Sequence, residues 1–341
     1  MMAEILAQPD AWRRVAKSVG GFLGGKSLPR ALSSSFLKSS KQAVVFGSGS
    51  SFHAALLARD YFSILSGIPS RAAHASEVFR WNEPQPDSVL ALALSHSGGS
   101  TDVRAAVRRA RRQGIATAAI TNIDDSPLAR EADAVLVTGA GVERAIPSTK
   151  GFTATIAASF LLACHARAAR RRRAWSTKSL LRASSRVETW LEAEESALAV
   201  EESAAVLARA RVVAFIGRGL LYPVACDAAL KFLEVTYSPA LAFPPDEFRH
   251  GPVAVVQEGF ALVALAPARN DTLISETRSR GAEVVVLESS NPRAQSLSLP
   301  RVDALLAPLV YTPALQLLAH AAGARLDRPI DRPRYLQKIV S

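Results

Sequence analysis

The sequence predicts an α/β protein with mostly parallel sheets, built in two parts of similar design. Short apolar runs of β type alternate with helical stretches along most of the 341 residues. One long acidic segment without Gly or Pro interrupts the alternation, which then begins again. A strand, a G-x-G turn and an Ala/Leu-rich helix open both parts, about 170 residues apart. This spacing indicates an internal duplication.

Seven runs are predicted as strands because they are short, apolar and followed by turn residues. They are residues 43–48, 88–95, 115–122, 133–138, 212–217, 261–267 and 283–289. Helices are expected to follow, among them 51–66, 101–113 and 151–173. Between the two parts, Glu188, Glu192, Glu195 and Glu202 recur at helical spacing, which favours a helical connector over 184–210.

The composition excludes several classes of protein. Lys+Arg 41 against Asp+Glu 30 gives a net charge of +11, but the segments 101–112 and 165–182 carry all of this excess. Nucleic acid or an anionic membrane is therefore not required as a partner. Two cysteines exclude a disulfide framework and a Cys-based zinc cluster, and they suit a reducing cytoplasm. The apolar stretch 151–166 is shorter than the ~20 residues of a membrane helix, and the N-terminus lacks a signal-peptide pattern.

The strongest local signal is the turn after the strand at 88–95. It reads Ser95-His96-Ser97-Gly98-Gly99-Ser100-Thr101, and a helix is expected from about Asp102. Hydroxyls and backbone N–H groups at a helix N-terminus favour an anion, and glycines let a phosphate approach. Because this turn does not read G-x-x-x-x-G-K-[ST], a phosphomonoester suits it better than a nucleoside triphosphate. An ordinary capping turn explains the same residues, so both interpretations stay open.

Two further turns are rich in hydroxyls. Gly47-Ser48-Gly49-Ser50-Ser51 follows the first strand, at the edge of the sheet where open α/β folds bind ligands. Ile146-Pro147-Ser148-Thr149-Lys150-Gly151 precedes the apolar helix expected at 151. Each can be a capping motif by itself. Three such turns along one sheet favour a single anion pocket.

The second part supplies groups that can transfer protons. Lys231 and Glu234 are spaced i and i+3 on a predicted helix, hence on one face. A surface ion pair is one interpretation, but the apolar residues around both predict burial. His250 lies between an Arg and a Gly-Pro turn, where it can be structural or can act as an acid or base near neutral pH.

These motifs and the C-terminal tail follow one another in a recognisable order. They are Gly49-Ser50-Ser51, Ser95-His96-Ser97-Gly98-Gly99-Ser100, Glu143 followed by Ser148-Thr149-Lys150, Ala229-Leu230-Lys231-Phe232-Leu233-Glu234, Glu247-Phe248-Arg249-His250-Gly251-Pro252, and Arg332-Pro333-Arg334-Tyr335-Leu336-Gln337-Lys338. In this order the chain resembles the sugar isomerase (SIS) superfamily, specifically the isomerase half of glutamine:fructose-6-phosphate aminotransferases. The matching family motifs are G-T-S, S-Q-S-G-E-T, S-T-K, A-L-K-x-x-E, E-x-[KR]-H-G-P and P-R-x-L-x-K.

The resemblance implies two tandem SIS domains, each a mostly parallel sheet flanked by helices in a three-layer α/β/α, flavodoxin-like fold. It implies that the substrate and its 6-phosphate are held by Ser50, Ser51, Ser95, His96, Ser97, Ser100, Ser148 and Glu143. It further implies that Glu234 moves a proton between C1 and C2, His250 opens the sugar ring, Lys231 assists at the oxygens and Lys338 can form a Schiff base. In the family this histidine comes from a neighbouring subunit, which implies a homodimer with shared active sites. No metal or other cofactor is expected.

The function expected from this resemblance is that of a cytoplasmic phosphosugar isomerase or deaminase. Its substrate would be an amino sugar 6-phosphate, most simply glucosamine 6-phosphate, giving fructose 6-phosphate and ammonia. An aldose–ketose isomerase, a fructosamine-phosphate deglycase and a non-catalytic phosphosugar sensor remain alternatives. Two departures bear on the choice of substrate, because His96 and Gly99 stand where the family loop has Gln and Glu. The chain shows no glutaminase half and no N-terminal cysteine nucleophile, so glutamine is not expected as its ammonia donor.

Five regions are expected along the chain. They are an N-terminal helical arm (1–40), a first SIS domain that binds the phosphosugar (41–183), the helical connector (184–210), a second SIS domain (211–326), and a C-terminal tail that closes the active site (327–341).

Overall fold

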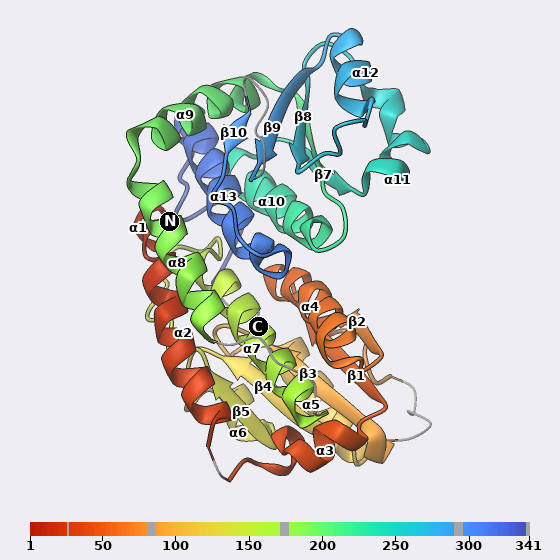
Figure 1. Ribbon diagram of the computed structural model, residues 1–341. Helices are drawn as coiled ribbons and strands as arrows, with labels where there is room; N and C mark the ends of the chain where they lie inside the picture. The colour runs from red at the N-terminus through yellow and green to blue at the C-terminus, as the bar shows by residue number, and fades with distance from the viewer. Residues whose placement is uncertain (26, 81–85, 171–176, 290–295, 339–341) are drawn as a thin grey trace. The chain divides into compact units, whose positions relative to one another are not determined.

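The computed structural model describes residues 1–341 except 26, 81–85, 171–176, 290–295 and 339–341. The chain divides into two compact units. Unit 1 comprises Met1–Ala7, Arg144–Thr149 and Ser185–Leu336, and unit 2 comprises Gln8–Glu143, Lys150–Ser184 and Gln337–Ser341. Each unit contains one five-stranded parallel sheet, which confirms the predicted α/β class and its duplication (Figure 1).

Unit 2 is organised around the sheet β2-β1-β3-β4-β5. Its strands are β1 (Gln42–Gly47), β2 (Ser70–His74), β3 (Val89–Leu94), β4 (Ala116–Thr121) and β5 (Ala134–Val137). Its helices are α2 (Gln8–Leu23), α3 (Ser34–Ser39), α4 (Ser50–Tyr61), α5 (Thr101–Arg112), α6 (Pro127–Glu131) and α7 (Lys150–Ala169). Helix α8 (Thr177–Glu192) begins in this unit and continues into unit 1.

Helices cover both faces of the unit 2 sheet. Alternate strand residues such as Val44 and Phe46 pack against Val103 and Val107 of α5. Helices α2, α4 and α7 pack together as the other layer, with α4 against β1 and α7 against β4. Side chains of successive strand residues point to opposite faces, so the continuous apolar runs are needed to fill two interfaces.

Unit 1 repeats this plan around the sheet β10-β9-β8-β6-β7. Its strands are β6 (Val212–Ile216), β7 (Ala240–Phe243), β8 (Phe260–Leu265), β9 (Glu283–Glu288) and β10 (Leu297–Ser298). Its helices are α1 (Met2–Leu6), α9 (Glu194–Arg209), α10 (Leu221–Thr236), α11 (Pro245–Arg249), α12 (Leu273–Ser279) and α13 (Ala307–Arg325). The acidic stretch expected as one connector thus forms the end of α8 and then α9, with Ala193 between them.

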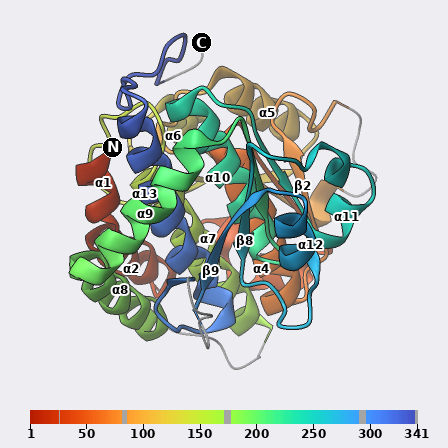
Figure 2. The same cartoon turned by 90° about the horizontal axis from the view of Figure 1, so that it is seen from above.

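The unit 1 sheet is also covered on both faces. Ala214 and Ile216 pack with Phe248 of α11 and Leu273 of α12. On the opposite face Phe215 contacts Phe232 of α10. Figure 2 shows α10 and α12 on opposite sides of β8 and β9. Each unit is therefore the three-layer α/β/α arrangement expected of the two halves.

The two long apolar helices belong to the cores of their units. Helix Lys150–Ala169 and the helical segment Ala304–Arg325 are apolar enough and long enough to cross a membrane by composition alone. Inside the structure 78% and 72% of their most apolar windows are buried. A helix that is hydrophobic all round is expected in such a core.

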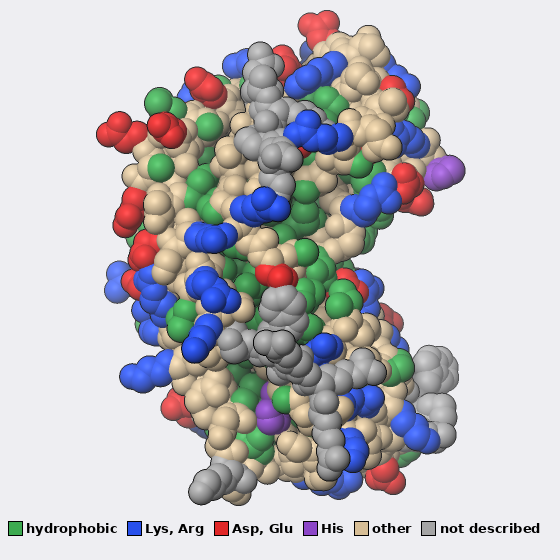
Figure 3. Space-filling model, in the orientation of Figure 1, with side chains coloured by type: hydrophobic (Ala, Val, Ile, Leu, Met, Phe, Trp, Pro, Cys, Tyr) green, Lys and Arg blue, Asp and Glu red, His purple; other side chains and the backbone are tan. Residues whose placement is uncertain are grey.

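The basic helix α5 is largely paired with acidic residues of its own unit. Arg104 and Arg108 both contact the Glu131 carboxylate, at 2.6 and 2.9 Å. Arg111 lies 3.2 Å from Asp133. On the face shown in Figure 3, Lys and Arg side chains are interspersed with Asp and Glu. Of the second basic segment, residues 171–176 lie outside the described residues.

Candidate functional site

The loop between β3 and α5 forms a cradle of hydroxyl and N–H groups in unit 2. Ser95 is 3% exposed, and its Oγ lies 3.2 Å from the Oγ of Ser100. The same Ser95 Oγ accepts the N–H of Gly98 at 3.2 Å. Ser100 occupies the N-cap position of α5 without a side-chain capping bond. Its hydroxyl is therefore directed into the cradle and does not satisfy the helix, which favours the anion-site interpretation over the capping one.

Gly98 allows this loop to approach the next turn of the chain. Its φ is +63°, and a Cβ at this position would lie 2.2 Å from the Oγ of Ser126. Its carbonyl accepts the N–H of Leu128 at 3.0 Å. The carbonyl of His96 accepts the N–H of Asn122 at 2.9 Å in the same way. The loop is thus held by the β4–α6 turn, which gives it a defined shape before any ligand binds.

The loop after β1 lies beside the loop after β3. The Ser48 hydroxyl donates to the Asp102 carboxylate in the first turn of α5. Gly47 is required at the end of β1, because a Cβ there would lie 2.7 Å from the backbone of Ser51. Ser50 and Ser51 begin α4 directly after this turn. Strand β1 has β2 on one side and β3 on the other, so these two loops flank the point where open α/β sheets bind ligands.

A charged cluster adjoins the cradle in unit 2. Glu143 accepts a hydrogen bond from the Gly151 N–H at 2.9 Å, and Lys338 Nζ lies 2.8 Å from its other oxygen. The Glu143 side chain is 1% exposed and that of Lys338 is 30% exposed. The His96 ring packs against the start of α7, where a Cβ on Gly151 would lie 2.7 Å from the ring. The structure therefore brings His96, Glu143 and Lys338 together from three distant segments.

The positive surroundings keep Glu143 ionised. Burial by itself raises the pKa of this carboxyl, but the charges of His96 and Lys338 and the hydrogen bonds from Lys338 and Gly151 outweigh it. The net result lowers the pKa of Glu143 to about 2. A carboxyl whose pKa is depressed in the folded state stabilises the fold above its unfolded pKa and loses this contribution as the pH falls toward the folded value.

Replacing Glu143 by Gln should make the free energy of unfolding less dependent on pH in the acid range. The shift from 4.5 to about 2 corresponds to about 3 kcal/mol, present at pH 7 and lost between about pH 5 and pH 2. We expect wild type to be more stable than Glu143→Gln at neutral pH and the difference to shrink as the pH falls from 5 toward 2. Thermal unfolding of both proteins from pH 7 to pH 2.5 measures this. A difference that stays constant over that range would contradict the ionised buried carboxylate.

Helix α10 of unit 1 carries the second group of predicted site residues. Lys231 Nζ is paired with the Glu234 carboxylate, and their side chains are 2% and 15% exposed. Helix α10 packs against α13, where Gly323 permits the approach because a Cβ there would lie 2.8 Å from the Val235 carbonyl. The ion pair expected from the i, i+3 spacing is thus present, and its lysine is buried by the surrounding apolar residues.

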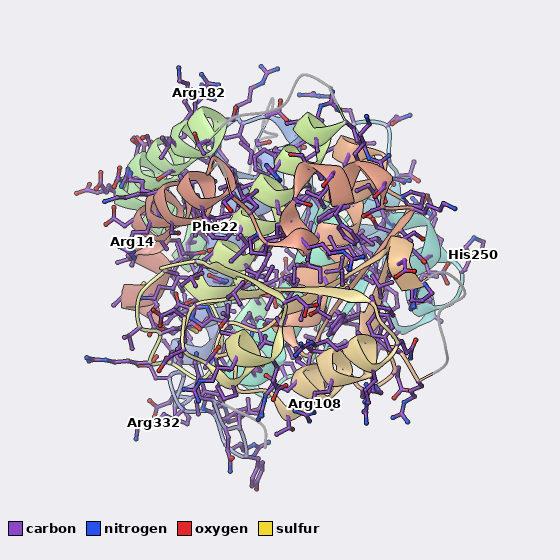
Figure 4. The ribbon with its side chains drawn as sticks, turned by 90° about the horizontal axis from the view of Figure 1, so that it is seen from below. Arg14, Phe22, Arg108, Arg182, His250 and Arg332 are labelled. Atoms are coloured by element: carbon purple, nitrogen blue, oxygen red, sulfur yellow. The ribbon has the colours of Figure 1, made fainter. Side chains whose placement is uncertain are left out.

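His250 lies on the outside of unit 1. It follows α11 directly, and its N–H donates to the Glu247 carbonyl at 3.0 Å. Its side chain is exposed, and Figure 4 shows it at the edge of the molecule, pointing away from the ribbon. The neighbouring Arg249 is fixed by Asp271 at 2.8 Å. A histidine presented in this way is available to a neighbouring molecule.

Tyr237, which the sequence reading did not single out, anchors the C-terminal tail within unit 1. It ends α10 in the left-handed region, at φ 64°. The Arg334 guanidinium lies 4.3 Å over its ring, and Arg328 lies at 5.1 Å. The backbone N–H of Arg334 also donates to the Tyr237 hydroxyl at 3.1 Å. The chain leading to Lys338 is therefore attached to the end of the helix that carries Lys231 and Glu234.

The corresponding loop of unit 1 lacks the cradle. After β8 the chain reads Ala266-Pro267-Ala268-Arg269-Asn270-Asp271-Thr272, where unit 2 has the serine-rich turn. Asp271 is paired with Arg249, and the cavity at this edge measures only about 20 Å³. An acidic side chain and a cavity with room for about one water molecule do not suit a phosphate. Between the described loops after β3 and after β8, it is the loop after β3 in unit 2 that presents a serine-rich turn.

The predicted site residues thus fall into two sets. Unit 2 holds Ser50, Ser51, Ser95, His96, Ser97, Ser100, Glu143 and Lys338, whereas unit 1 holds Ser148, Lys231, Glu234 and His250. Ser148 lies in the segment Arg144–Thr149, so its place beside the cradle stays a prediction. No group of three or more His, Cys, Asp or Glu side chains suited to a metal occurs among the described residues.

Comparison with known proteins identifies the family. The SIS domain family matches residues 36–164 and 206–294, which is more than half of the chain and includes every strand of the two sheets except β10. The chain belongs to the SIS family. Both matched segments coincide with the duplicated α/β cores, so two tandem SIS domains are present.

Particular relatives extend this result. The chain is 35% identical over 314 residues to a glutamine–fructose-6-phosphate aminotransferase of Legionella pneumophila, covering 88% of this chain and 51% of that protein. It thus spans about half the length of the curated relatives it matches. The C-terminal domain of the Francisella tularensis glucosamine-fructose-6-phosphate aminotransferase has a TM-score of 0.85 at 27% identity, with 98% of each chain covered. A Thermotoga maritima glucosamine-6-phosphate deaminase has the same fold, with a TM-score of 0.75 at 23% identity over 98% of this chain and 99% of that one.

Proposed function

We propose that this SIS protein is a cytoplasmic deaminating isomerase of an amino sugar 6-phosphate, converting glucosamine 6-phosphate into fructose 6-phosphate and ammonia. The overall change is ring opening, proton transfer from C2 to C1 and hydrolysis of the resulting C2 imine. Water supplies the C2 oxygen, and nitrogen leaves as ammonia. Neither a metal nor a redox cofactor is needed to balance these steps.

The phosphate is assigned to the cradle of unit 2. Ser95, Ser97 and Ser100 provide hydroxyls at the N-terminus of α5, and the loop after β1 adds Ser50 and Ser51. The positive end of the helix dipole favours a dianionic group at this place. Asp102 does not oppose the phosphate strongly, because its carboxylate is occupied by Ser48 and by the N–H of Val103.

The observation that carries the proposal is the Lys231–Glu234 pair, whose lysine is buried and whose carboxylate keeps 15% of its side chain exposed. A phosphosugar sensor requires the phosphate cradle but has no use for an ion pair with a buried lysine, which is costly to bury. A 1,2-proton transfer requires one carboxylate that serves both carbons, and a nearby ammonium stabilises charge developing on the sugar oxygens. We therefore assign the proton transfer to Glu234 and the oxygen contact to Lys231.

Ring opening and carbonyl activation are assigned to His250 and Lys338. His250 is exposed, and we propose that it acts in the site of a second subunit of a homodimer. Lys338 carries a primary amine that can condense with an open-chain ketose. Lysine suits this role, whereas arginine keeps its charge under all ordinary conditions.

Simple aldose–ketose isomerisation is the second candidate. His96 and Gly99 replace the Gln and Glu of the family loop, and Gly99 removes a carboxylate from the wall of the cradle. Loss of this carboxylate changes which sugar substituents the wall can bind, and it favours a phosphosugar without an amino group as the substrate of the same residues.

Incubation of the purified protein with glucosamine 6-phosphate tests the proposal. We expect ammonia and fructose 6-phosphate in equal amounts, and no ammonia from the Ser95→Ala/Ser97→Ala double variant at low substrate concentration. Glucose 6-phosphate and fructose 6-phosphate are assayed in parallel for interconversion. Interconversion without ammonia release favours the isomerase, and thermal stabilisation by these sugars without any turnover identifies a sensor.

A further inference from the structure

The ion pair between Glu143 and Lys338 joins residues that are 195 positions apart in the chain. Both belong to unit 2, and the two atoms are 2.8 Å apart. The Glu143 side chain is almost fully buried, whereas about a third of the Lys338 side chain is accessible. A buried carboxylate requires compensating partners, so the position of the tail lysine is strongly favoured here.

The carboxylate is held in a fixed orientation. One oxygen accepts the N–H of Gly151 at the start of α7, and the other faces Lys338. A helix N-terminus stabilises a negative charge and directs its N–H groups at it. Glu143 is thereby prevented from following the lysine if the tail moves, and the ion pair defines one place for the Lys338 nitrogen.

The charged groups that lower the pKa of Glu143 are positive. His96 faces it from the loop after β3, and Lys150 at the start of α7 approaches Gly141, two residues before Glu143. Arg14 of α2 donates to the carbonyl of Ala140 at 2.9 Å. With a pKa of about 2, the Glu143 carboxylate is a poor proton acceptor near neutral pH. It therefore does not act as a base for the lysine.

We propose that Glu143 is a positioning residue that stores Lys338 as an ion pair, and that this pair must open before Lys338 can react with a carbonyl. Condensation forms a carbon–nitrogen bond with the lone pair of the amine and releases the carbonyl oxygen as water, so an engaged ammonium is unreactive. In the resting protein the Lys338 amine thus lies next to the cradle, where the ion pair with Glu143 protects it from reaction. The inference rests on the proposed function only for the role given to Lys338.

Acetylation by the N-hydroxysuccinimide ester of acetic acid tests the ion pair without any sugar. The full-length protein is labelled briefly at pH 7.5, and each lysine is quantified by peptide mass spectrometry. Lys17 and Lys38 are exposed and serve as internal references. In wild type we expect Lys338 to react at least tenfold more slowly than these references. This comparison requires no variant and so does not depend on whether one folds.

Glu143→Gln and Glu143→Asp then separate charge from packing. The Gln amide oxygen can still accept the Gly151 N–H, so this variant removes the charge and keeps the backbone contact. We expect its Lys338 to react about tenfold faster than in wild type, with Lys17 and Lys38 unchanged. Glu143→Asp restores the charge and should restore most of the protection. Lys338 reacting as fast as the references in wild type, or equally fast in wild type and Glu143→Gln, would overturn the proposal.

Borohydride reduction in the presence of fructose 6-phosphate tests the proposed function separately. A stable secondary amine on Lys338 is expected if the lysine forms an imine with the sugar. Absence of this adduct in a protein that shows the labelling pattern above contradicts the Schiff-base role but leaves the ion-pair proposal standing.

Discussion

Glu234→Gln should lower kcat on glucosamine 6-phosphate by roughly 10³-fold and leave KM within a few-fold of wild type. The amide has the size and shape of the carboxyl group but cannot accept the C2 proton. In the proposed mechanism the phosphate cradle supplies most of the substrate affinity, and this variant leaves the cradle unchanged. Steady-state kinetics of ammonia release, together with exchange of the C2 hydrogen into D₂O, measure the effect.

The matched control is Glu202→Gln, which changes an exposed glutamate on α9 and should leave both constants unchanged. Burial of Lys231 next to a neutral Gln destabilises the fold, so thermal unfolding is followed in parallel. Mixing Glu234→Gln subunits with His250→Asn subunits should restore part of the activity if the two residues act across a dimer. Wild-type exchange of the C2 hydrogen in Glu234→Gln would exclude Glu234 as the base.

The fold was predictable because its central strands are buried on both faces. Such strands must be apolar throughout, and all seven predicted runs coincide with strands in the structure. Three strands were not predicted, β2, β7 and β10, and each lies at an edge of its sheet. Strand β2 reads Ser-Arg-Ala-Ala-His and is only partly buried, and β10 has two residues, so neither shows a sustained apolar pattern.

The candidate site was predictable where chemistry is local in sequence. The serine-rich turns and the Lys231–Glu234 spacing each combine their groups within a few residues. In contrast, the contacts of Glu143 depend on Lys338 at the far end of the chain, and nothing in either local sequence specifies the pairing. The stacking of Arg328 and Arg334 on Tyr237 likewise joins residues that are far apart in the sequence. Only the folded chain reveals these contacts, because the C-terminal tail packs against elements that lie much earlier in the sequence.

Gly98→Ala is expected to destabilise unit 2 by about 3 kcal/mol and to abolish phosphate binding by the cradle. A left-handed φ costs a non-glycine residue roughly 1–2 kcal/mol, and overpacking adds roughly 1–3 kcal/mol. Here φ is +63°, and the new Cβ would lie 2.2 Å from Ser126 Oγ and 2.9 Å from Thr121 Oγ1. Displacing the loop also moves the Gly98 N–H that Ser95 accepts. Thermal unfolding and calorimetric titration with glucosamine 6-phosphate measure the two effects.

Three companion variants separate backbone strain from steric overlap. Gly49 also has a positive φ, +55°, but no atom lies within 4 Å of its Cβ position, so Gly49→Ala should show the strain alone. At Gly21 in α2 no atom lies within 4 Å of the new Cβ and φ is not positive, so Gly21→Ala should be neutral or slightly stabilising. Adding Ser126→Gly to Gly98→Ala removes the closest overlap, at an N-cap where Gly costs only a few tenths of a kcal/mol, and leaves the 2.9 Å approach to Thr121 Oγ1. If this double variant is no more stable than Gly98→Ala, contact with the β4–α6 turn does not shape the cradle; recovered stability with recovered sugar binding shows that it does.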